Sequence, residues 1–263
     1  MNRYLRNLNR IEFIITLACT GKCKHCSEGD HKRTGENINK DIAAEAVKYI
    51  AEKYNIRSVM TFGGEPLLYP ETVCTIQSIA REMRIPQRQL ITNGFFSKDP
   101  CRIQSVAEQI AECGVNDVLL SVDAFHQETI PLEYVSVFAK ALKENGVPLR
   151  THPAWLISPD AENPYNKTTK EILSVFTALG IETNEGNVIF PSGNARKYLS
   201  AYFDLSNEVK SPYWEDPEDV RAVCIGANGD LLNGNIYHSR IILFDMDDLF
   251  TRHEACKQSS SQQ

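Results

Sequence analysis

Residues 11–26 read IEFIITLACTGKCKHC, a β-prone run that leads directly into three closely spaced cysteines. Three residues separate Cys19 from Cys23, and two separate Cys23 from Cys26. This spacing lets one short loop wrap a compact metal centre with three thiolates, one fewer than the four that close a structural zinc site or a fully ligated iron–sulfur cluster. A cluster held by three cysteines leaves one iron open to another molecule, so the loop indicates a reactive centre.

The composition of the chain limits the classes of protein to consider. Its 263 residues suffice for one large domain or two small ones, and 42% of them are hydrophobic, enough for a sizeable core. A net charge of −6 without a basic block argues against nucleic acid as a partner. The sequence has neither a signal-peptide core nor a run of about 18 apolar residues, so we expect a cytoplasmic protein without membrane contact. In such a protein three clustered cysteines, out of eight, indicate metal rather than disulfides.

Strand and helix signals alternate over the first three quarters of the chain. The predicted strands are 11–17, 56–62, 89–92, 117–122, 149–157 and 186–190, and the predicted helices are 42–54, 71–83, 99–112, 131–144 and 169–179. Such repeats predict an α/β fold with parallel strands, either a partial (β/α)6 TIM-like barrel or a doubly wound sheet.

The alternation of predicted strands and helices ends near residue 193. We therefore divide the chain into a core barrel, residues 1–193, and a small C-terminal extension, residues 194–263. In the extension the sequence predicts a helix at 195–203, a β-hairpin at 223–232, a short helix at 240–250 and a frayed tail at 259–263.

Unusual motifs follow the predicted strands. The glycine-rich and polar positions are Gly63, Gly64, Glu65 and Pro66 after the second strand, Asn93 after the third, Ser121 and Asp123 at the end of the fourth, and Ser192 after the sixth. Sites in parallel α/β sheets form at the carboxyl ends of strands, so we expect these residues and the cysteine loop to share one rim. Taken singly, the glycines and Asn93 could be turn residues, and Ser121 and Asp123 could cap the next helix.

With this cysteine spacing and the Gly-Gly-Glu-Pro motif, the chain resembles the radical S-adenosylmethionine (SAM) superfamily over residues 11–193. The resemblance implies one 4Fe–4S cluster on Cys19, Cys23 and Cys26, with SAM bound to the open iron through its amino and carboxylate groups. It also implies reductive cleavage of SAM and abstraction of a hydrogen atom from a substrate. One departure is His25, which stands where many members carry an aromatic residue before the third cysteine.

Chemical type suggests how the rim residues would hold SAM. Gly63 and Gly64, followed by Pro66, let backbone approach the ligand closely, and Glu65 can accept hydrogen bonds from the methionyl amine. The short polar side chains suited to the ribose hydroxyls, the SAM carboxylate and the adenine end are those of Asn93, Ser121, Asp123 and Ser192.

The substrate is less clearly indicated than the cofactor. Residues 223–230, VCIGANGD, look like a reduced remnant of the C-terminal domain that carries further clusters in peptide-modifying relatives, which favours a ribosomally synthesised peptide. Only Cys224 and Cys256 follow residue 193, so we predict a single cluster. Cys224 is a candidate hydrogen donor if its hairpin folds over the barrel mouth, or else a buried structural cysteine. Cys101, near a helix N-terminus, is a second candidate.

Two other functions remain open. One is a radical SAM enzyme that acts on a small molecule or activates another enzyme by forming a glycyl radical. The other is a non-catalytic zinc-binding protein in which His25 or His31 adds a fourth ligand to the three cysteines. For an enzyme of this superfamily, the resemblance also implies an electron donor similar to flavodoxin or ferredoxin.

Overall fold

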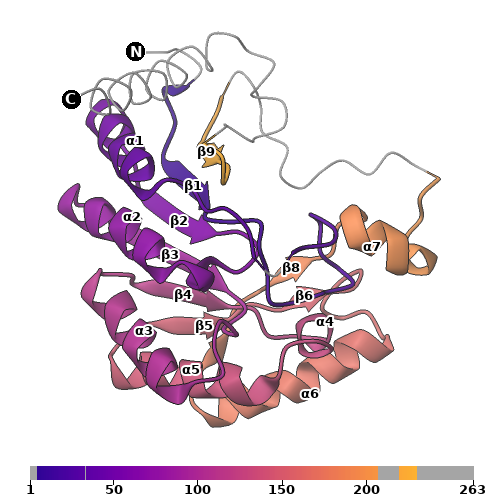
Figure 1. The fold of residues 1–263 in the computed structure, drawn as a ribbon. Helices are drawn as coiled ribbons and strands as arrows, with labels where there is room; N and C mark the ends of the chain where they lie inside the picture. Colours follow the sequence, from indigo (N-terminus) through magenta and orange to yellow (C-terminus); the bar gives the residue numbers. More distant parts are fainter. Residues whose placement is uncertain (1–4, 33, 207–218, 230–263) are drawn as a thin grey trace.

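A seven-stranded parallel sheet forms the centre of the molecule. The computed structural model describes residues 5–32, 34–206 and 219–229. The strands are β1 (Arg10–Ile14), β2 (Ser58–Phe62), β3 (Gln87–Thr92), β4 (Asp117–Leu120), β5 (Leu149–Thr151), β7 (Glu182–Thr183) and β9 (Ala222–Ile225). Their spatial order is β7-β5-β4-β3-β2-β1-β9, and each neighbouring pair is parallel. The predicted α/β fold with parallel strands is confirmed (Figure 1).

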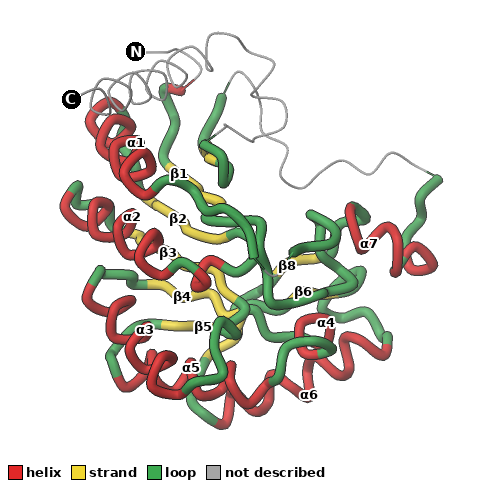
Figure 2. Tube along the Cα trace, viewed as in Figure 1, coloured by secondary structure: helices red, strands yellow, loops and turns green. Residues whose placement is uncertain are grey.

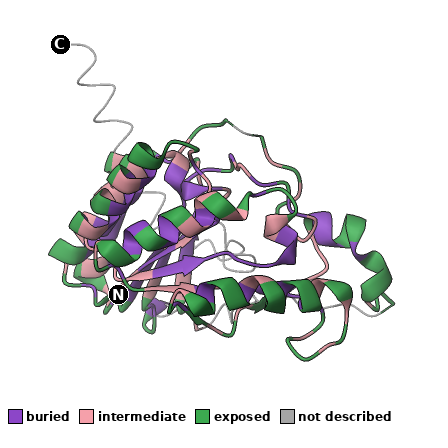
Figure 3. Ribbon diagram, turned by 90° about the horizontal axis from the view of Figure 1, so that it is seen from below, coloured by how far each residue is buried: buried purple, intermediate pink, exposed green. Residues whose placement is uncertain are grey.

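The structure describes five longer helices, which pack along the sheet, and two short ones, α4 and α7. They are α1 (Lys40–Lys53), α2 (Pro70–Glu82), α3 (Pro100–Glu112), α4 (Ala124–Gln127), α5 (Leu132–Glu144), α6 (Pro164–Ala178) and α7 (Gly193–Tyr198). Figure 3 shows the outward sides of the helices exposed and their inward sides buried. In α3 the buried residues Ile103, Val106, Ala107 and Ile110 recur at the spacing of one helix face, as an amphipathic helix on a sheet requires.

Local signals set several of the helix starts. The side chain of Asn39 accepts hydrogen bonds from the N–H groups of Asp41 and Ile42 at the start of α1. The side chain of Asp99 accepts one from Cys101 N–H, and Pro100 occupies the first turn of α3, which confirms the predicted start of that helix.

The two faces of the sheet differ in polarity. On β1, Ile11 and Phe13 are fully buried in the main hydrophobic core, whereas Arg10 and Glu12 alternate with them and are partly exposed. Residues that pair across neighbouring strands lie on the same face of the sheet. Glu12 pairs with Met60 of β2 on one side and with Cys224 of β9 on the other, so these three residues share the second face. One face therefore packs on the helices, and the other carries polar groups.

The predicted fifth and sixth strands are partly wrong. Residues 149–157 form β5 and then β6 (Ala154–Trp155), which leaves the main sheet and pairs with β8 (Asn187–Val188). Pro153 lies at the break and lacks the N–H that a central strand needs. The predicted sixth strand, 186–190, therefore contributes to the small sheet, and β7 takes the place beside β5.

The boundaries of helices and strands in the C-terminal half of the chain also differ from the prediction. α6 begins at Pro164 rather than Thr169, because Asn163 caps it by accepting a hydrogen bond from Asn166 N–H. Beyond α7 and a short 3-10 turn (Ser200–Tyr202), β9 adds to the main sheet beside β1. The second strand of the predicted hairpin, the helix at 240–250 and the tail lie outside the described residues. The division at residue 193 stays a prediction.

Over the described residues, no helix has the length and apolar character needed to cross a membrane.

Candidate functional site

The cysteine loop leaves the carboxyl end of β1, among the loops that gather at the carboxyl ends of the strands (Figure 2). Backbone hydrogen bonds fold it on itself. Cys19 N–H donates to Lys32 O at 2.8 Å, and Cys26 N–H donates to Cys23 O at 3.3 Å. Gly21 lies so close that an added Cβ would stand 3.3 Å from Cys23 Sγ. The sequence thus brings three thiols together within one tight loop.

The thiols lie below the surface. Cys23 is 8% exposed, and Cys19 and Cys26 are half-buried. Burial, with a smaller contribution from Glu65, raises the pKa of the Cys19 thiol to about 12. Burial, with a smaller contribution from Asp123, also raises the pKa of Cys23. Without a metal the thiols of Cys19 and Cys23 stay protonated at neutral pH, and it is metal coordination that deprotonates such a group.

The separation of the thiols suits a cluster better than a single ion. Within the described part of the chain, only His25, Asp123 and His126 bring three potential ligand atoms within 4.8 Å of one another. The three cysteine sulfurs do not form such a group, whereas one zinc ion with Zn–S bonds of about 2.3 Å would hold them about 3.8 Å apart. Three thiols on one loop with this wider spacing fit a 4Fe–4S cluster.

The two histidines considered as a fourth zinc ligand lie in different surroundings. His31 Nε2 is 3.0 Å from Cys26 Sγ, and its Nδ1 is 2.7 Å from Leu17 O. His25 instead packs against the rings of Phe125 and His126. Only His31 contacts a cysteine sulfur, so the zinc alternative with His25 as a ligand does not match the structure.

The glycine motif packs on the cysteine loop. Gly63 has a φ of +146°, and an added Cβ would stand 2.5 Å from Thr16 O. At Gly64 the Cβ would stand 2.2 Å from Ala18 O. The backbones are joined there, because Gly64 N–H donates to Thr16 O and Glu65 N–H to Ala18 O, both at 2.8 Å. The close approach that these glycines permit is therefore made with the loop itself.

Glu65 links the ends of two strands to this loop. Its buried carboxylate accepts hydrogen bonds from Leu67 N–H, Thr92 Oγ1–H and Asn93 N–H at 2.7–2.9 Å. Burial nevertheless raises its pKa to about 7. Asn93 continues the link, since its Nδ2 lies 3.6 Å from Cys19 Sγ and 3.2 Å from Thr20 Oγ1. Pro66 begins the short 3-10 helix Pro66–Leu68 that follows. Glu65, Pro66 and Asn93 therefore share one rim with the thiols.

Asp123 is fully buried at the end of β4 and caps α4. Its Oδ1 accepts from the N–H groups of Phe125 and His126, both at 2.9 Å. Its Oδ2 accepts from Ala154 N–H at 3.0 Å and lies 2.7 Å from His126 Nδ1. Burial alone would raise the pKa of Asp123, but His126 and these hydrogen bonds outweigh it and hold the pKa well below its ordinary value. Ser121 precedes it, and its N–H donates to Thr92 O.

His126 was not singled out in the sequence. It lies three residues after Asp123, a spacing that places both on one helical turn, and this spacing is the signal that could have found it.

The first residues of α7 hold the cysteine loop near Cys26. Gly193 has a φ of +50°, and an added Cβ would stand 2.2 Å from Ser27 O. Asn194 N–H donates to Cys26 O at 2.9 Å, and its Nδ2 donates to Cys23 O at 3.3 Å. Ser192 precedes α7 and makes no side-chain cap. The adjacent Asn194, which sequence reasoning missed, is the residue that contacts the cysteines.

The two other candidate cysteines belong to other elements of the fold. Cys224 is buried in the edge strand β9, where it pairs with Glu12 of β1, and the rest of its predicted hairpin lies outside the described residues. Burial, with smaller contributions from Glu12 and Glu28, raises its pKa to about 12. Cys101 is exposed in the first turn of α3. The role of Cys224 as a hydrogen donor stays a prediction.

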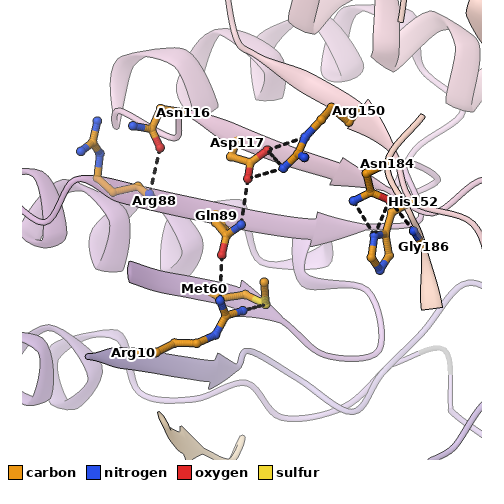
Figure 4. A network of polar contacts seen from close by, with 10 residues as sticks. All are labelled: Arg10, Met60, Arg88, Gln89, Asn116, Asp117, Arg150, His152, Asn184 and Gly186. Atoms are coloured by element: carbon orange, nitrogen blue, oxygen red, sulfur yellow. Dashed lines mark hydrogen bonds and ion pairs between the residues drawn. The ribbon is translucent and has the colours of Figure 1, made fainter. Parts of the chain in front are cut away.

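Below the rim, a chain of polar side chains crosses the second face of the sheet (Figure 4). Arg10 Nη1 donates to Gln89 Oε1 at 3.1 Å, and Gln89 Nε2 donates to Asp117 Oδ2 at 2.8 Å. Arg150 forms an ion pair with the same carboxylate at 2.8 Å. These residues come from four strands, so the inner face offers charged and hydrogen-bonding groups.

Comparisons with known proteins identify a family and a set of sequence relatives. The model of a family described as the Radical SAM superfamily matches residues 13–151. A probable GTP 3′,8-cyclase of Methanocaldococcus jannaschii is 27% identical over 130 residues, which cover 48% of this chain and 40% of that protein. A GTP 3′,8-cyclase of Microcystis aeruginosa is 26% identical over 129 residues, covering 46% and 37%. The match thus spans well under half of these curated relatives.

Solved structures resemble the fold over most of the chain. Native anSMEcpe with bound AdoMet and Cp18Cys peptide has a TM-score of 0.58 at 15% identity, covering 92% of this chain and 80% of that one. Streptococcus suis SuiB bound to S-adenosylmethionine has a TM-score of 0.55 at 14% identity, covering 89% and 62%. At these identities the matches establish the fold.

Proposed function

The chain belongs to the radical SAM superfamily and is an enzyme, and from this premise we propose that it cleaves SAM reductively and takes a hydrogen atom from a peptide. The observation that carries the proposal is the loop of three thiols, held at the carboxyl rim of a parallel sheet by Gly64 on one side and Asn194 on the other. A non-catalytic zinc protein is set aside, because the family is one of enzymes and the thiol spacing does not suit one ion.

The residues present fit the cofactors of this superfamily, a 4Fe–4S cluster and SAM. When bound, these groups supply a one-electron cleavage that yields a 5′-deoxyadenosyl radical able to abstract hydrogen. Cys19, Cys23 and Cys26 would hold the cluster.

Of the residues proposed for SAM, Asn93 has the strongest support, because its side chain lies beside Cys19. The carboxylate of Asp123 already accepts from four protein donors, so its contribution would be to position α4. Glu65 would brace the strand ends in the same way. Gly63, Gly64 and Pro66 would shape the loop, and Ser121 and Ser192 remain proposed contacts.

A peptide substrate is supported by two observations. The peptide-bound anSMEcpe structure resembles 92% of this chain, so the likeness extends beyond the family core at residues 13–151. The polar inner face, with Arg10, Gln89, Asp117 and Arg150, can also hydrogen-bond the amides and charges of a peptide. We further propose a flavodoxin- or ferredoxin-like electron donor, and a core of residues 1–193 that binds both cofactors.

A small-molecule substrate is the second candidate, because the curated sequence relatives are named GTP 3′,8-cyclases. The match covers only 40% and 37% of these two relatives, so a substrate such as GTP is a proposal for this chain.

The test of the chemistry is SAM cleavage. Protein reconstituted anaerobically with iron and sulfide, then given SAM and dithionite, should release 5′-deoxyadenosine, whereas Cys23→Ala should release none. Cys113→Ala, which removes a buried thiol outside the loop, is the matched control and should behave as wild type. A wild type that holds stoichiometric zinc and makes no 5′-deoxyadenosine would overturn the proposal.

The test of the substrate is isotope transfer. Peptides encoded near the gene would be prepared with deuterium and compared with deuterated GTP. If the substrate is a peptide, deuterium should appear in 5′-deoxyadenosine with the deuterated peptide and not with deuterated GTP. Deuterium transfer from GTP and not from the peptide would favour the small-molecule reaction.

A further inference from the structure

Two thiols outside the cysteine loop meet between neighbouring helices. Cys74 lies in α2, and Cys113 is the C-cap residue that ends α3. Cys113 belongs to the main hydrophobic core and Cys74 packs against that core, yet both are free thiols in the structure. The chemistry proposed above makes no use of this pair.

One backbone carbonyl brings the two cysteines together. Gln109 O accepts a hydrogen bond from Cys113 N–H at 2.9 Å, and Cys74 Sγ lies 3.6 Å from the same oxygen. Cys113 Sγ lies 3.3 Å from Ile110 O, on the same last turn of α3. The sulfur of Cys74 is therefore placed at the turn of α3 that ends in Cys113, and the packing of both helices on each other and on the core fixes this arrangement.

The two thiols also interact directly through a side-chain hydrogen bond. It is the main cause of both pKa shifts, since it raises the pKa of Cys74, the donor, and lowers the pKa of Cys113, the acceptor. Burial opposes the lower pKa of Cys113, whereas the N–H groups of Val115 and of Cys113 itself, and the charge of Arg81, add to it. Arg81 is held there because its Nη1 donates to Glu112 O at 2.7 Å. The pair therefore favours a thiolate on Cys113 beside a protonated Cys74, and the thiolate is the reactive form of cysteine.

We propose that Cys74 and Cys113 form a disulfide by exchange with a low-molecular-weight disulfide. Cys113 is 5% exposed whereas Cys74 is half-buried, so a small reagent reaches the pair from the side of Cys74. Cysteine can pack simply as a small apolar residue, but such packing does not require a thiol on each helix at the point where the two helices touch. The bond would join the helix that follows the glycine motif to the helix that follows Asn93.

The exchange takes two steps. The thiolate of one cysteine attacks a sulfur of the small disulfide, forms a mixed disulfide and releases one small thiolate. The thiolate of the other cysteine attacks the protein sulfur of this mixed disulfide, forms the Cys74–Cys113 bond and releases the second small thiolate. The two protons of the protein thiols pass to the released thiolates, so the protein loses the two electrons that the small disulfide gains. Sulfurs already in hydrogen-bond contact need only a small side-chain rotation to reach the S–S bond length of about 2.0 Å.

The test is a disulfide map of the cluster-loaded protein. Reconstituted protein would be incubated anaerobically with hydroxyethyl disulfide, unfolded in N-ethylmaleimide and digested with trypsin without reduction. Cleavage after Arg81 and Arg102 places Cys74, Cys101 and Cys113 in three different peptides. We expect linked peptides that contain Cys74 and Cys113, at least tenfold more abundant than the mixed disulfide on the exposed Cys101, with the iron content per chain unchanged.

Single substitutions separate the pair from its surroundings. Cys74→Ser and Cys113→Ala each remove one partner and should abolish the linked peptides. Cys101→Ala is the control, because it keeps both thiols of the pair and should give the same linked peptides as wild type. The proposal is overturned if Cys74 and Cys113 are both recovered as alkylated thiols while Cys101 carries the reagent, or if the linked peptides appear only in samples that have lost iron. SAM cleavage is measured separately and bears only on the proposed function.

Discussion

Gly64 lies against the backbone of the cysteine loop, and Asn194 lies against the other side of the same loop. Both contact main-chain atoms of this loop, so their influence comes from position rather than from reactive chemistry. Glu65 and Asp123 are similar, since each buried carboxylate accepts three or more hydrogen bonds from protein donors. At the residue scale, much of the polar chemistry at this rim serves to fix the loop that carries the thiols.

The substitution Gly64→Ala tests this packing. The added methyl group would stand 2.2 Å from Ala18 O, a contact with backbone that no side-chain rotation relieves. We expect a loss of roughly 2–4 kcal/mol in the free energy of unfolding and a lower iron content after reconstitution. Gly35→Ala is the control, because its added carbon would meet only ordinary contacts at 3.4 Å and beyond. Equal iron content in the two variants would count against the packing role.

Glu65 should make stability depend on pH. Burial raises its pKa in the folded protein to about 7, from an ordinary 4.5, so between these values the folded state holds a proton that the unfolded chain has released. This contribution is full below about pH 4.5 and is lost as the pH rises through 7. The total is about 3 kcal/mol.

Thermal unfolding from pH 4.5 to 8 would measure this effect. Wild type should lose stability relative to Glu65→Gln as the pH rises, whereas the exposed Glu108→Gln should track wild type. A difference between wild type and Glu65→Gln that stays constant with pH would contradict the raised pKa.

At the scale of elements, capping and proline set where helices begin, and a proline sets where a strand breaks. α3 and α6 both start at a proline preceded by an Asp or Asn cap, although the apolar spacing places only the first correctly. Pro153 separates β5 from β6 and sends the chain into a second sheet. These boundaries matter for the site, because Ala154 N–H, just after the break, is a donor to Asp123.

The contribution of the Asn163 cap of α6 to stability can be measured directly. Asn163→Ala removes the acceptor for Asn166 N–H and two donors to loop carbonyls, and we expect a loss of about 1–2 kcal/mol in unfolding free energy. Ser192→Ala, at the N-cap of α7, removes no side-chain cap and should stay within about 0.5 kcal/mol of wild type. Urea unfolding of both variants gives the comparison, and equal losses would refute the cap.

At the scale of the whole molecule, a strand from late in the chain pairs with the first strand. β9 pairs with β1, and its residues Val223 and Ile225 belong to the main core. The strand that leads into the cysteine loop therefore has neighbours on both sides. The stability of the site thus depends on residues beyond the proposed core boundary at 193.

Ile225→Ala tests that dependence. The side chain is fully buried, so its truncation should cost about 2–5 kcal/mol and lower the melting temperature of the cluster-bearing protein in a single transition. Val188→Ala, at an exposed position of β8, is the control and should have little effect. A separate early transition with the cluster still bound would show that β9 belongs to an independent unit.

The sequence by itself determined the three-cysteine loop, the glycine motif, the succession of β1 to β4 along the chain and the start of α3. These depend on spacings within about ten residues, where covalent connection and local hydrogen bonding dominate. Only the tertiary structure decided the exchange of β7 for the predicted sixth strand, the pairing of β9 with β1, the contact of Asn194 with Cys26, and the meeting of His25 with Asp123 and His126. Each of these contacts joins segments that are distant in the sequence. Burial and packing across the sheet select among the possible partners, and no local sequence pattern encodes that selection.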